Sequence, residues 1–331
     1  MNSFEKIDLT KFYREANVAV IGDIMVDRYL KGTVDRISPE APVPIVFVED
    51  VKNIPGGAAN VMANASGLGA RVMALGVVGD DSEGKFVISD LFNRGVDVHN
   101  ILVDTDRSTT LKCRVMVGSH MMMRYDMENR HSISQELESK LVNSFEQIAK
   151  LVDILVISDY EKGLMTQSLI KSILNIAERY NLCTLVDPKA RSIWHYVGIK
   201  YVKINLLNAE IATGISRSSH EDDARICSVI ADTLDCESVI LTIGKQGLSI
   251  FSQGKLDHVS AMAKDIYDVT GAGDVVSSVL GIALANGYNI KDACCISTIA
   301  AGIKVGKVGT YSLTLEELID KINRYNESSL K

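Results

Sequence analysis

One short motif combines the start of a helix with a carboxylate. Gly271-Ala272-Gly273-Asp274 leads into the apolar run 275–285, which is typical of a buried helix. The first turn of a helix has unpaired N–H groups and the positive end of the helix dipole, and together these bind anions such as phosphate. A carboxylate in that turn is either a favourable helix cap or, beside a phosphate, a general base. In the functional interpretation the backbone forms an anion hole and Asp274 takes a proton from an attacking hydroxyl.

Other polar residues stand beside predicted elements in the N-terminal part of the chain. Gly56 and Gly57 precede a helical run, and paired glycines allow a ligand to approach the backbone closely. Asn60 follows and offers both a hydrogen-bond donor and an acceptor. Asp27 comes after the apolar run 17–24, which predicts a buried first strand. These residues are candidates for substrate binding, and the alternatives are a plain loop–helix junction and a turn.

Short apolar segments alternate with amphipathic ones through the rest of the chain. The predicted strands cover 154–158, 184–186, 201–204, 239–243 and 248–251, and the predicted helices cover roughly 135–151, 167–180, 222–233 and 315–325. This alternation predicts an α/β fold with a mostly parallel sheet. Polar residues follow the strands at their carboxyl ends, where open α/β sheets bind ligands, although each also suits a turn. They are Asp159, Lys162, Lys189, Asn205, Thr242 and Gly244.

Three β-rich segments, 43–51, 109–117 and 121–125, stand apart from this pattern. Prolines precede the first segment, and proline beside a strand favours an edge position. We predict that the segments form a small β-lid. Because the lid strands are apolar for an edge, we also predict a homodimer in which two lids pack together. Basic residues in or near the lid are either a solvated face or a grip for an anionic substrate group. They are Arg36, Lys112, Arg114 and Arg124.

The composition restricts the class of protein. The chain has 331 residues, 47% of them apolar, and a formal net charge of −7 without a dense Lys/Arg block, so we expect no nucleic-acid or membrane partner. Six cysteines without a CxxC pair predict reduced thiols in a reducing compartment. The N-terminus is polar, and no apolar run is long enough to span a bilayer. We therefore expect a cytoplasmic protein with a single domain, residues 1–331.

Two of these motifs, residues 56–60 and 268–274, resemble the signatures of the ribokinase-like family of sugar kinases. They occur in the family's order together with Asp27, Asn205 and residues 242–247, and the resemblance covers nearly the whole chain. It implies a three-layer α/β sandwich with a mostly parallel central sheet and β-lid elements at about 36–54 and 108–127. It also implies that the protein uses ATP and Mg²⁺.

A closer resemblance is to the heptose 7-phosphate kinases of lipopolysaccharide-core synthesis. It is carried by residues 22–29, 36–44, 158–163, 187–189 and 305–310. It implies phosphoryl transfer from ATP to the anomeric hydroxyl of D-glycero-D-manno-heptose 7-phosphate, which gives the 1,7-bisphosphate. In that group a nucleotidyltransferase domain often follows the kinase, and we expect none in this chain.

The resemblance assigns a role to each candidate residue. The base is Asp274, and the anion hole is formed by Gly271, Ala272 and Gly273. The sugar phosphate is held by Asp27, Arg36, Gly56, Gly57, Asn60, Lys112, Arg124, Asp159 and Lys162, of which the basic members bind the existing 7-phosphate. The nucleotide is held by Lys189, Asn205, Asn208, Thr242, Gly244 and Gly247.

One position departs from the family pattern. The family has an Asn-x-x-Glu motif whose Glu organises Mg²⁺ and phosphate through water, whereas Asn208 stands where that Glu is expected. An amide brings no charge to a hard cation. Glu210, two residues further on, is the candidate replacement for contact with the metal through water.

Three alternative functions fit parts of the sequence. Another kinase of the same family, acting on a neutral sugar or a nucleoside, is disfavoured by the 36–44 stretch and by the basic lid. A non-catalytic sugar or nucleotide sensor on this fold is disfavoured by Asp274 and mildly favoured by Asn208. A dinucleotide-binding oxidoreductase lacks the G-x-G-x-x-G motif after the first strand.

Overall fold

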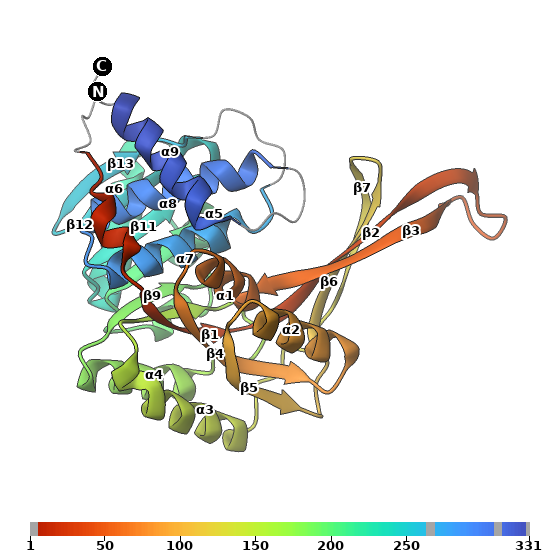
Figure 1. The fold of residues 1–331 in the computed structure, drawn as a ribbon, viewed down its shortest axis with the longest axis horizontal. Helices are drawn as coiled ribbons and strands as arrows, with labels where there is room; N and C mark the ends of the chain where they lie inside the picture. The colour runs from red at the N-terminus through yellow and green to blue at the C-terminus, as the bar shows by residue number, and fades with distance from the viewer. Residues whose placement is uncertain (1–5, 263–268, 308–312, 329–331) are drawn as a thin grey trace.

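The computed structural model describes residues 6–262, 269–307 and 313–328, and it consists of a body from which a ribbon of β-strands projects (Figure 1). The central sheet of the body has nine strands in the order β13-β12-β11-β10-β9-β8-β1-β4-β5. The strands from β11 to β5 run parallel, and β12 and β13 are added antiparallel at one edge. Their bounds are β1 (Asn17–Gly22), β4 (Arg71–Gly79), β5 (Asp97–Asp104), β8 (Ile154–Ser158), β9 (Cys183–Asp187), β10 (Tyr201–Asn205), β11 (Ser238–Thr242), β12 (Leu248–Ser252) and β13 (Lys255–Val259).

Helices cover both faces of this sheet. The first face carries α1 (Ala58–Gly67), α2 (Ser82–Asn93), α7 (Ala272–Ala285), α8 (Ile290–Val305) and α9 (Leu315–Ser328). The second face carries α3 (Gln135–Ile148), α4 (Gln167–Arg179), α5 (Leu206–Thr213) and α6 (His220–Leu234). Successive strand side chains point to opposite faces, so Val20 packs in the first core and Ile21 in the second. The predicted α/β class with a mostly parallel sheet is confirmed.

A second sheet of four strands forms the lid, in the order β3-β2-β6-β7. The strands are β2 (Ile24–Ile37), β3 (Pro44–Gly57), β6 (Thr110–Val117) and β7 (His120–Met127). β2 pairs parallel with β6, the other pairs are antiparallel, and β3 is an edge strand. The ends of β2 and β3 that are far from the body extend well away from it (Figure 1). Only Asp23 separates β1 from β2, so the chain passes from one sheet to the other without a turn, and the sequence analysis did not predict β2.

The predicted helices α3, α4, α6 and α9 agree with the structure to within three residues at each end. The sequence analysis left β4, α2, β5, α5, β13 and α8 unassigned. All six cysteines are free thiols. Of the helices in the described parts of the chain, none is both long enough and apolar enough to cross a membrane.

Candidate active site

Asp274 lies in the first turn of α7, and the backbone before it explains the glycine in the motif. Gly271 is the N-cap of α7 and has a φ of 74°, a left-handed conformation that glycine adopts without strain. A Cβ atom at this position would lie 2.6 Å from the side-chain nitrogen of Asn60. Glycine at position 271 therefore allows both the left-handed turn before α7 and the close approach of Asn60 on α1 to the start of α7.

Two donors hold the Asp274 carboxylate from opposite sides. The Tyr160 hydroxyl donates to Oδ1 at 2.6 Å, and Asn60 Nδ2 donates to Oδ2 at 2.7 Å. Asp274 is only 5% exposed. Burial raises the pKa of Asp274 to about 6, while the hydrogen bonds from Tyr160 and Asn60 oppose that rise. A carboxylate with this pKa is ionised at neutral pH and still able to accept a proton, as a general base must be.

A cavity of about 420 Å³ lies on one side of the start of α7. Five of the six residues predicted to bind nucleotide line this cavity, namely Lys189, Asn205, Thr242, Gly244 and Gly247. Ala272 and Gly273 of the predicted anion hole line it too, so the helix N-terminus faces the space. Its wall also includes apolar side chains such as Met262 and Val276. An apolar pocket that ends on a helix N-terminus suits a nucleotide with its phosphates at the helix.

A buried lysine stands at the junction of this cavity and α7. Lys203, on β10, is 3% exposed and forms an ion pair with Asp187 at the end of β9. Its ammonium also donates to the carbonyl oxygen of Gly273 at 3.1 Å and to the Ser277 hydroxyl at 3.3 Å. Both Lys203 and Asp187 line the nucleotide cavity. The site therefore holds a fixed positive charge beside the first turn of α7.

A second cavity, of about 210 Å³, lies against Gly271. Asp27 and Asn60, two of the predicted substrate-binding residues, line it. Gly56 and Gly57 form its neighbouring backbone, where a Cβ on Gly56 would lie 2.7 Å from Asp27 Oδ2 and one on Gly57 would lie 2.7 Å from the carbonyl oxygen of Asp23. The paired glycines thus let β3 pass close to these acidic residues. This cavity brings hydroxyl-binding groups next to the proposed base.

The strand register places the charged lid residues on one face. Asp27 on β2 is the Cα partner of Lys112 on β6, and Lys112 is the partner of Asp126 on β7. Arg114 and Arg124, also paired with each other, lie two residues further along and therefore point to the same face. Arg114 forms an ion pair with Asp27 at 2.5 Å.

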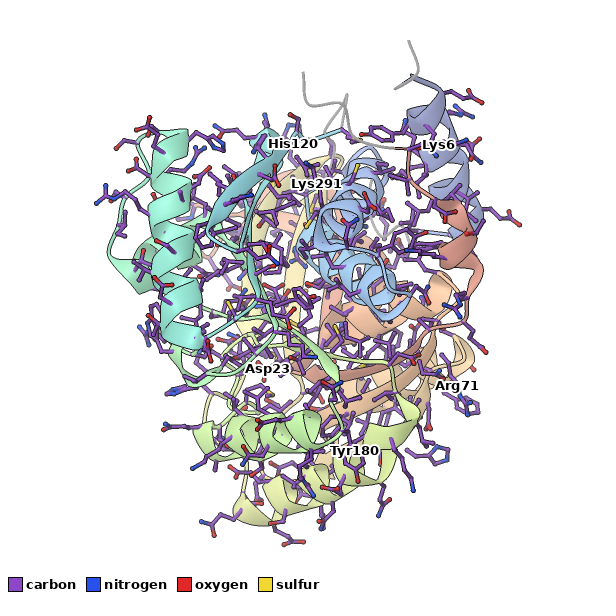
Figure 2. The ribbon with its side chains drawn as sticks, turned by 90° about the vertical axis from the view of Figure 1, so that its left-hand side faces the viewer. Lys6, Asp23, Arg71, His120, Tyr180 and Lys291 are labelled. Atoms are coloured by element: carbon purple, nitrogen blue, oxygen red, sulfur yellow. The ribbon has the colours of Figure 1, made fainter. Side chains whose placement is uncertain are left out.

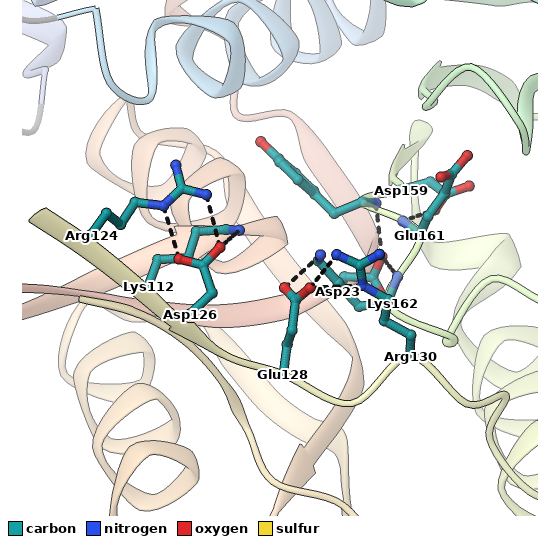
Figure 3. A network of polar contacts seen from close by, with 10 residues as sticks. Asp23, Lys112, Arg124, Asp126, Glu128, Arg130, Asp159, Glu161 and Lys162 are labelled. Carbon is teal, nitrogen blue, oxygen red and sulfur yellow. Dashed lines mark hydrogen bonds and ion pairs between the residues drawn. The ribbon is translucent and has the colours of Figure 1, made fainter. Parts of the chain in front are cut away.

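Three of the predicted phosphate-binding cations are held by two acidic residues (Figure 3). Arg124 donates to both oxygens of Asp126 at 2.8 Å, and Lys112 contacts the same carboxylate at 3.4 Å. Lys162 forms an ion pair with Glu128 at 2.5 Å. Burial lowers the pKa of Lys112 and the nearby charges of Lys162 and Arg124 lower it further, so the three cations are close enough to repel one another. The group is a convergent cationic cluster.

Two further carboxylates near Lys162, those of Asp23 and Asp159, are buried (Figure 3), and Asp23 lies in the interior of the body (Figure 2). Asp23 Oδ2 accepts the backbone N–H groups of Tyr160 at 2.7 Å and Lys162 at 3.2 Å. Asp159 accepts the backbone N–H of Glu161 and the Tyr196 hydroxyl, each at 2.8 Å. Burial raises the pKa values of both Asp23 and Asp159. Asp159, predicted to touch substrate, instead holds the loop that carries Tyr160 and Lys162.

Three predicted site residues lie apart from the others. Arg36 is exposed near the far end of β2, nine residues or about 30 Å along the strand from Asp27, and stacks on Phe47. Glu210 uses its carboxylate to accept the backbone N–H of Arg217 at 2.7 Å. Asn208 lies in the first turn of α5, with its N–H donating to Asn205 Oδ1. Neither Asn208 nor Glu210 is among the described residues that line the nucleotide cavity.

Parts of two predicted motifs fall outside the described residues. Asp268 of the signature 268–274 belongs to the gap after residue 262, and residues 308–310 of the stretch 305–310 belong to the next gap.

The sequence analysis did not select Tyr160, Lys203 and Asp187 as site residues. Tyr160 comes two residues after β8 and Asp187 is the last residue of β9, but nothing in the local sequence distinguishes either of them from a turn residue. Lys203 carries a clearer signal, because a charge inside the apolar strand Tyr201–Asn205 requires a buried partner. That partner, Asp187, is sixteen residues earlier in the sequence.

The carboxylate available at the nucleotide cavity suits a magnesium ion that binds as a complex with a nucleotide. Within residues 6–262, 269–307 and 313–328 there is no cluster of three His, Cys, Asp or Glu side chains able to cage a metal. Mg²⁺ commonly uses one or two carboxylates, several waters and substrate phosphates. Asp187 provides a carboxylate on the wall of the nucleotide cavity.

Solved structures of two sugar kinases share this fold. Arabidopsis thaliana ribokinase in complex with ribose and ATP superposes with a TM-score of 0.76 at 16% identity, covering 93% of this chain and 99% of that one. Phosphofructokinase-2 from Escherichia coli superposes with a TM-score of 0.77 at 16% identity, covering 96% and 100%. The fold is therefore ribokinase-like.

The sequence places the chain more narrowly. The profile of the pfkB family carbohydrate kinases matches residues 15–317. Bifunctional protein HldE from Helicobacter hepaticus is 35% identical over 310 residues, or 94% of this chain and 64% of that protein. The same protein from Geobacter metallireducens is 36% identical over 323 residues, or 96% and 65%. The chain thus spans slightly less than two thirds of these relatives. It belongs to the pfkB family of carbohydrate kinases and is a phosphotransferase that acts on a sugar hydroxyl.

Proposed function

We propose that this protein is an ATP-dependent kinase that phosphorylates the anomeric hydroxyl of D-glycero-D-manno-heptose 7-phosphate. Two kinds of observation support the proposal. The relatives named HldE match over nearly the whole chain. The observation that carries the substrate class is the cationic cluster of Lys112, Arg124 and Lys162 on the lid and beside it, because a neutral sugar needs no such group.

The acceptor sugar would occupy the cavity between Asp27, Asn60 and Gly271, with one hydroxyl at Asp274. Its existing phosphate would replace Asp126 and Glu128 as the partner of the three cations. A phosphate carries close to two charges and has three terminal oxygens, so it can contact all three cations at once. A kinase for neutral sugars would gain nothing from this arrangement.

In the transfer step the sugar oxygen forms a bond to the γ-phosphorus of ATP while the bond from that phosphorus to the bridging oxygen of ADP breaks. The hydroxyl proton moves to Asp274. The backbone N–H groups at the start of α7 and the Lys203 ammonium stabilise the charge on the phosphoryl oxygens. Mg²⁺, when bound, neutralises phosphate charge, and Asp187 is the residue that would orient its water shell.

The lid also supports the predicted homodimer. Several of its large apolar side chains are exposed, including Val51 at 56%, Met121 at 57%, Met123 at 54% and Met127 at 55%. An apolar sheet with a free edge is prone to unwanted pairing unless a partner covers it. A second copy of the chain would cover the edge of both lids at once.

A panel of acceptors tests the substrate assignment. The purified protein is incubated with MgATP and heptose 7-phosphate, the unphosphorylated heptose, fructose 6-phosphate, ribose or a nucleoside, and kcat/KM is measured for each. ³¹P NMR then identifies the product, for which a phosphate on the anomeric carbon is expected. A higher kcat/KM for a neutral sugar or a nucleoside would replace the proposal with the near alternative. Binding of ligands without turnover of any of them would indicate a sensor.

A further inference from the structure

We propose that Tyr160 is a positioning residue for the catalytic base, an inference that rests on the proposed role of Asp274. Tyr160 lies in the loop after β8, 114 residues away from Asp274 in the sequence. It contacts the base, lines the nucleotide cavity and is held from behind by a buried carboxylate. It lies between the predicted substrate-binding residues Asp159 and Lys162 in the stretch 158–163, but the sequence analysis assigned it no role.

The hydrogen bonds define the orientation of the carboxylate. Tyr160 donates to Oδ1 and Asn60 donates to Oδ2, so each oxygen of Asp274 has one donor from the protein. A carboxylate oxygen has two acceptor positions, and one on each oxygen remains for the sugar hydroxyl. The Asn60 amide is itself oriented, because Asn64 Nδ2 donates to Asn60 Oδ1 at 2.9 Å. Removal of the Tyr160 hydroxyl would leave Oδ1 without a donor and the carboxylate free to rotate about χ2.

Tyr160 is fixed at both its backbone and its ring. Its backbone N–H donates to Asp23 Oδ2 at 2.7 Å, and Asp23 is 4% exposed at the junction of β1 and β2. The Lys189 ammonium lies over the ring, 4.1 Å from its centroid, as a cation–π contact. The hydroxyl is therefore held in place, and the same ring that contacts the base forms part of the nucleotide cavity.

The Tyr160 hydroxyl affects the pKa of Asp274, and this effect can be measured. The hydrogen bonds from Tyr160 and Asn60 lower the pKa of Asp274 against the effect of burial, Lys203 lowers it further, and Asp187 raises it. The pKa of Tyr160 itself is raised well above its ordinary value by burial and by the charge of Asp274, so its hydroxyl stays protonated and can only donate. Without this donor the ionised form of Asp274 loses stabilisation and its pKa rises.

The test is the pH profile of Tyr160→Phe, which keeps the ring under Lys189 and removes only the hydroxyl. We expect the acid limb of kcat/KM to move up by about one pH unit. We expect kcat at pH 7 to fall by roughly tenfold, part of which returns at pH 8.5 as Asp274 ionises. The dissociation constant for ATP should change little. In an Asp274→Asn background the same substitution should have almost no further effect on kcat, because Tyr160 acts through the base.

Tyr288→Phe is the matched control. Tyr288 is also buried, and its hydroxyl donates to the backbone carbonyl oxygen of Asp8, outside the site. Its loss should lower the melting temperature and leave the acid limb in place. The inference about Tyr160 is overturned if Tyr160→Phe has an unmoved acid limb, or if Tyr288→Phe moves the limb equally. If Asp274→Asn instead keeps near-wild-type turnover, the proposed base is wrong, which is a separate outcome.

Discussion

Asp274→Asn separates a general base from a helix cap, because asparagine keeps the shape and the capping ability and removes the basicity. General-base catalysis contributes roughly 10²–10⁴-fold, so we expect kcat to fall by that factor while ATP affinity changes little. Asp292, in the first turn of α8, is the matched control, since it is a helix-start carboxylate without a place in the site. Asp292→Asn should leave kcat within about twofold of wild type.

The pH dependence of kcat/KM, compared between wild type and Asp274→Asn, provides a second test of the base. With the pKa of Asp274 at about 6, roughly a tenth of the enzyme is ionised at pH 5, so wild-type kcat/KM should be about tenfold lower there than at pH 8. Sugar phosphates also titrate near pH 6, so the profile of Asp274→Asn is needed as the reference. A titration due to the substrate persists in the variant, whereas one due to the base disappears. A wild-type profile that stays flat to pH 5, or a variant with near-wild-type turnover, would refute the assignment of Asp274 as the base.

Stability provides an independent measurement with a definite sign. A pKa raised from 3.8 to about 6 means that the ionised carboxylate destabilises the folded state by about 3 kcal/mol. This cost is absent below pH 3.8, develops between the two pKa values and is complete above about pH 6. The melting temperature of Asp274→Asn relative to wild type should therefore be higher at pH 8 than at pH 5. An equal difference at both pH values would show that Asp274 does not titrate in this range.

Three further predictions concern the lid and the metal. Arg124→Ala should raise KM for a sugar phosphate by about tenfold and leave KM for the unphosphorylated sugar unchanged, since a charge-assisted bond at a half-exposed site is worth about 1.5 kcal/mol; equal effects would count against phosphate binding by the lid. Sedimentation velocity should find a dimer at micromolar concentration and a monomer for Met123→Glu, because that change puts a charge in the lid contact; a monomeric wild type would contradict the dimer. Asn208 lies off the cavity wall but contacts Asn205, which lines it, so Asn208→Glu adds a carboxylate near the metal and should lower the free Mg²⁺ needed for half-maximal activity by roughly fivefold; an unchanged Mg²⁺ titration would mean that the ATP phosphates alone hold the metal.

Ion pairs hold the cationic cluster on and beside the lid together. Lys112, Arg124 and Lys162 would repel one another if left alone, and Asp126 and Glu128 neutralise that repulsion. The hydrogen bonds from Arg124 hold the pKa of Asp126 at about 2, so this carboxylate stays charged throughout the working range of pH. The cluster is thereby kept assembled, with carboxylates in the place that we assign to a phosphate.

Features that depend on local backbone chemistry can be predicted from the sequence alone. A glycine-rich turn before an apolar helix predicts an anion-binding helix start, and the structure has Gly271 in a left-handed conformation at the N-cap of α7. Alternating strands and amphipathic helices predict a parallel sheet, and the site residues Lys189, Asn205 and Thr242 follow from the rule that ligands bind at the carboxyl ends of strands. The parallel sheet, the glycine at the helix start and the position of the strand-end residues were predictable because each depends on residues that are neighbours in the chain.

Contacts between side chains that are far apart in the sequence could be identified only from the tertiary structure. Asn60 donates to Asp274 although the two residues are 214 positions apart in the sequence. The burial of Lys203 is explained only by its ion pair with Asp187, which the fold brings next to it. The structure also separates Arg36 from the other predicted substrate residues, because β2 continues from the body into the lid and places that residue about 30 Å along the strand from Asp27. A spacing pattern records residue types along one strand or helix. It cannot record how far a strand extends in space or which face of another element lies against it, and the second of these determines the pKa and the orientation of the Asp274 carboxylate.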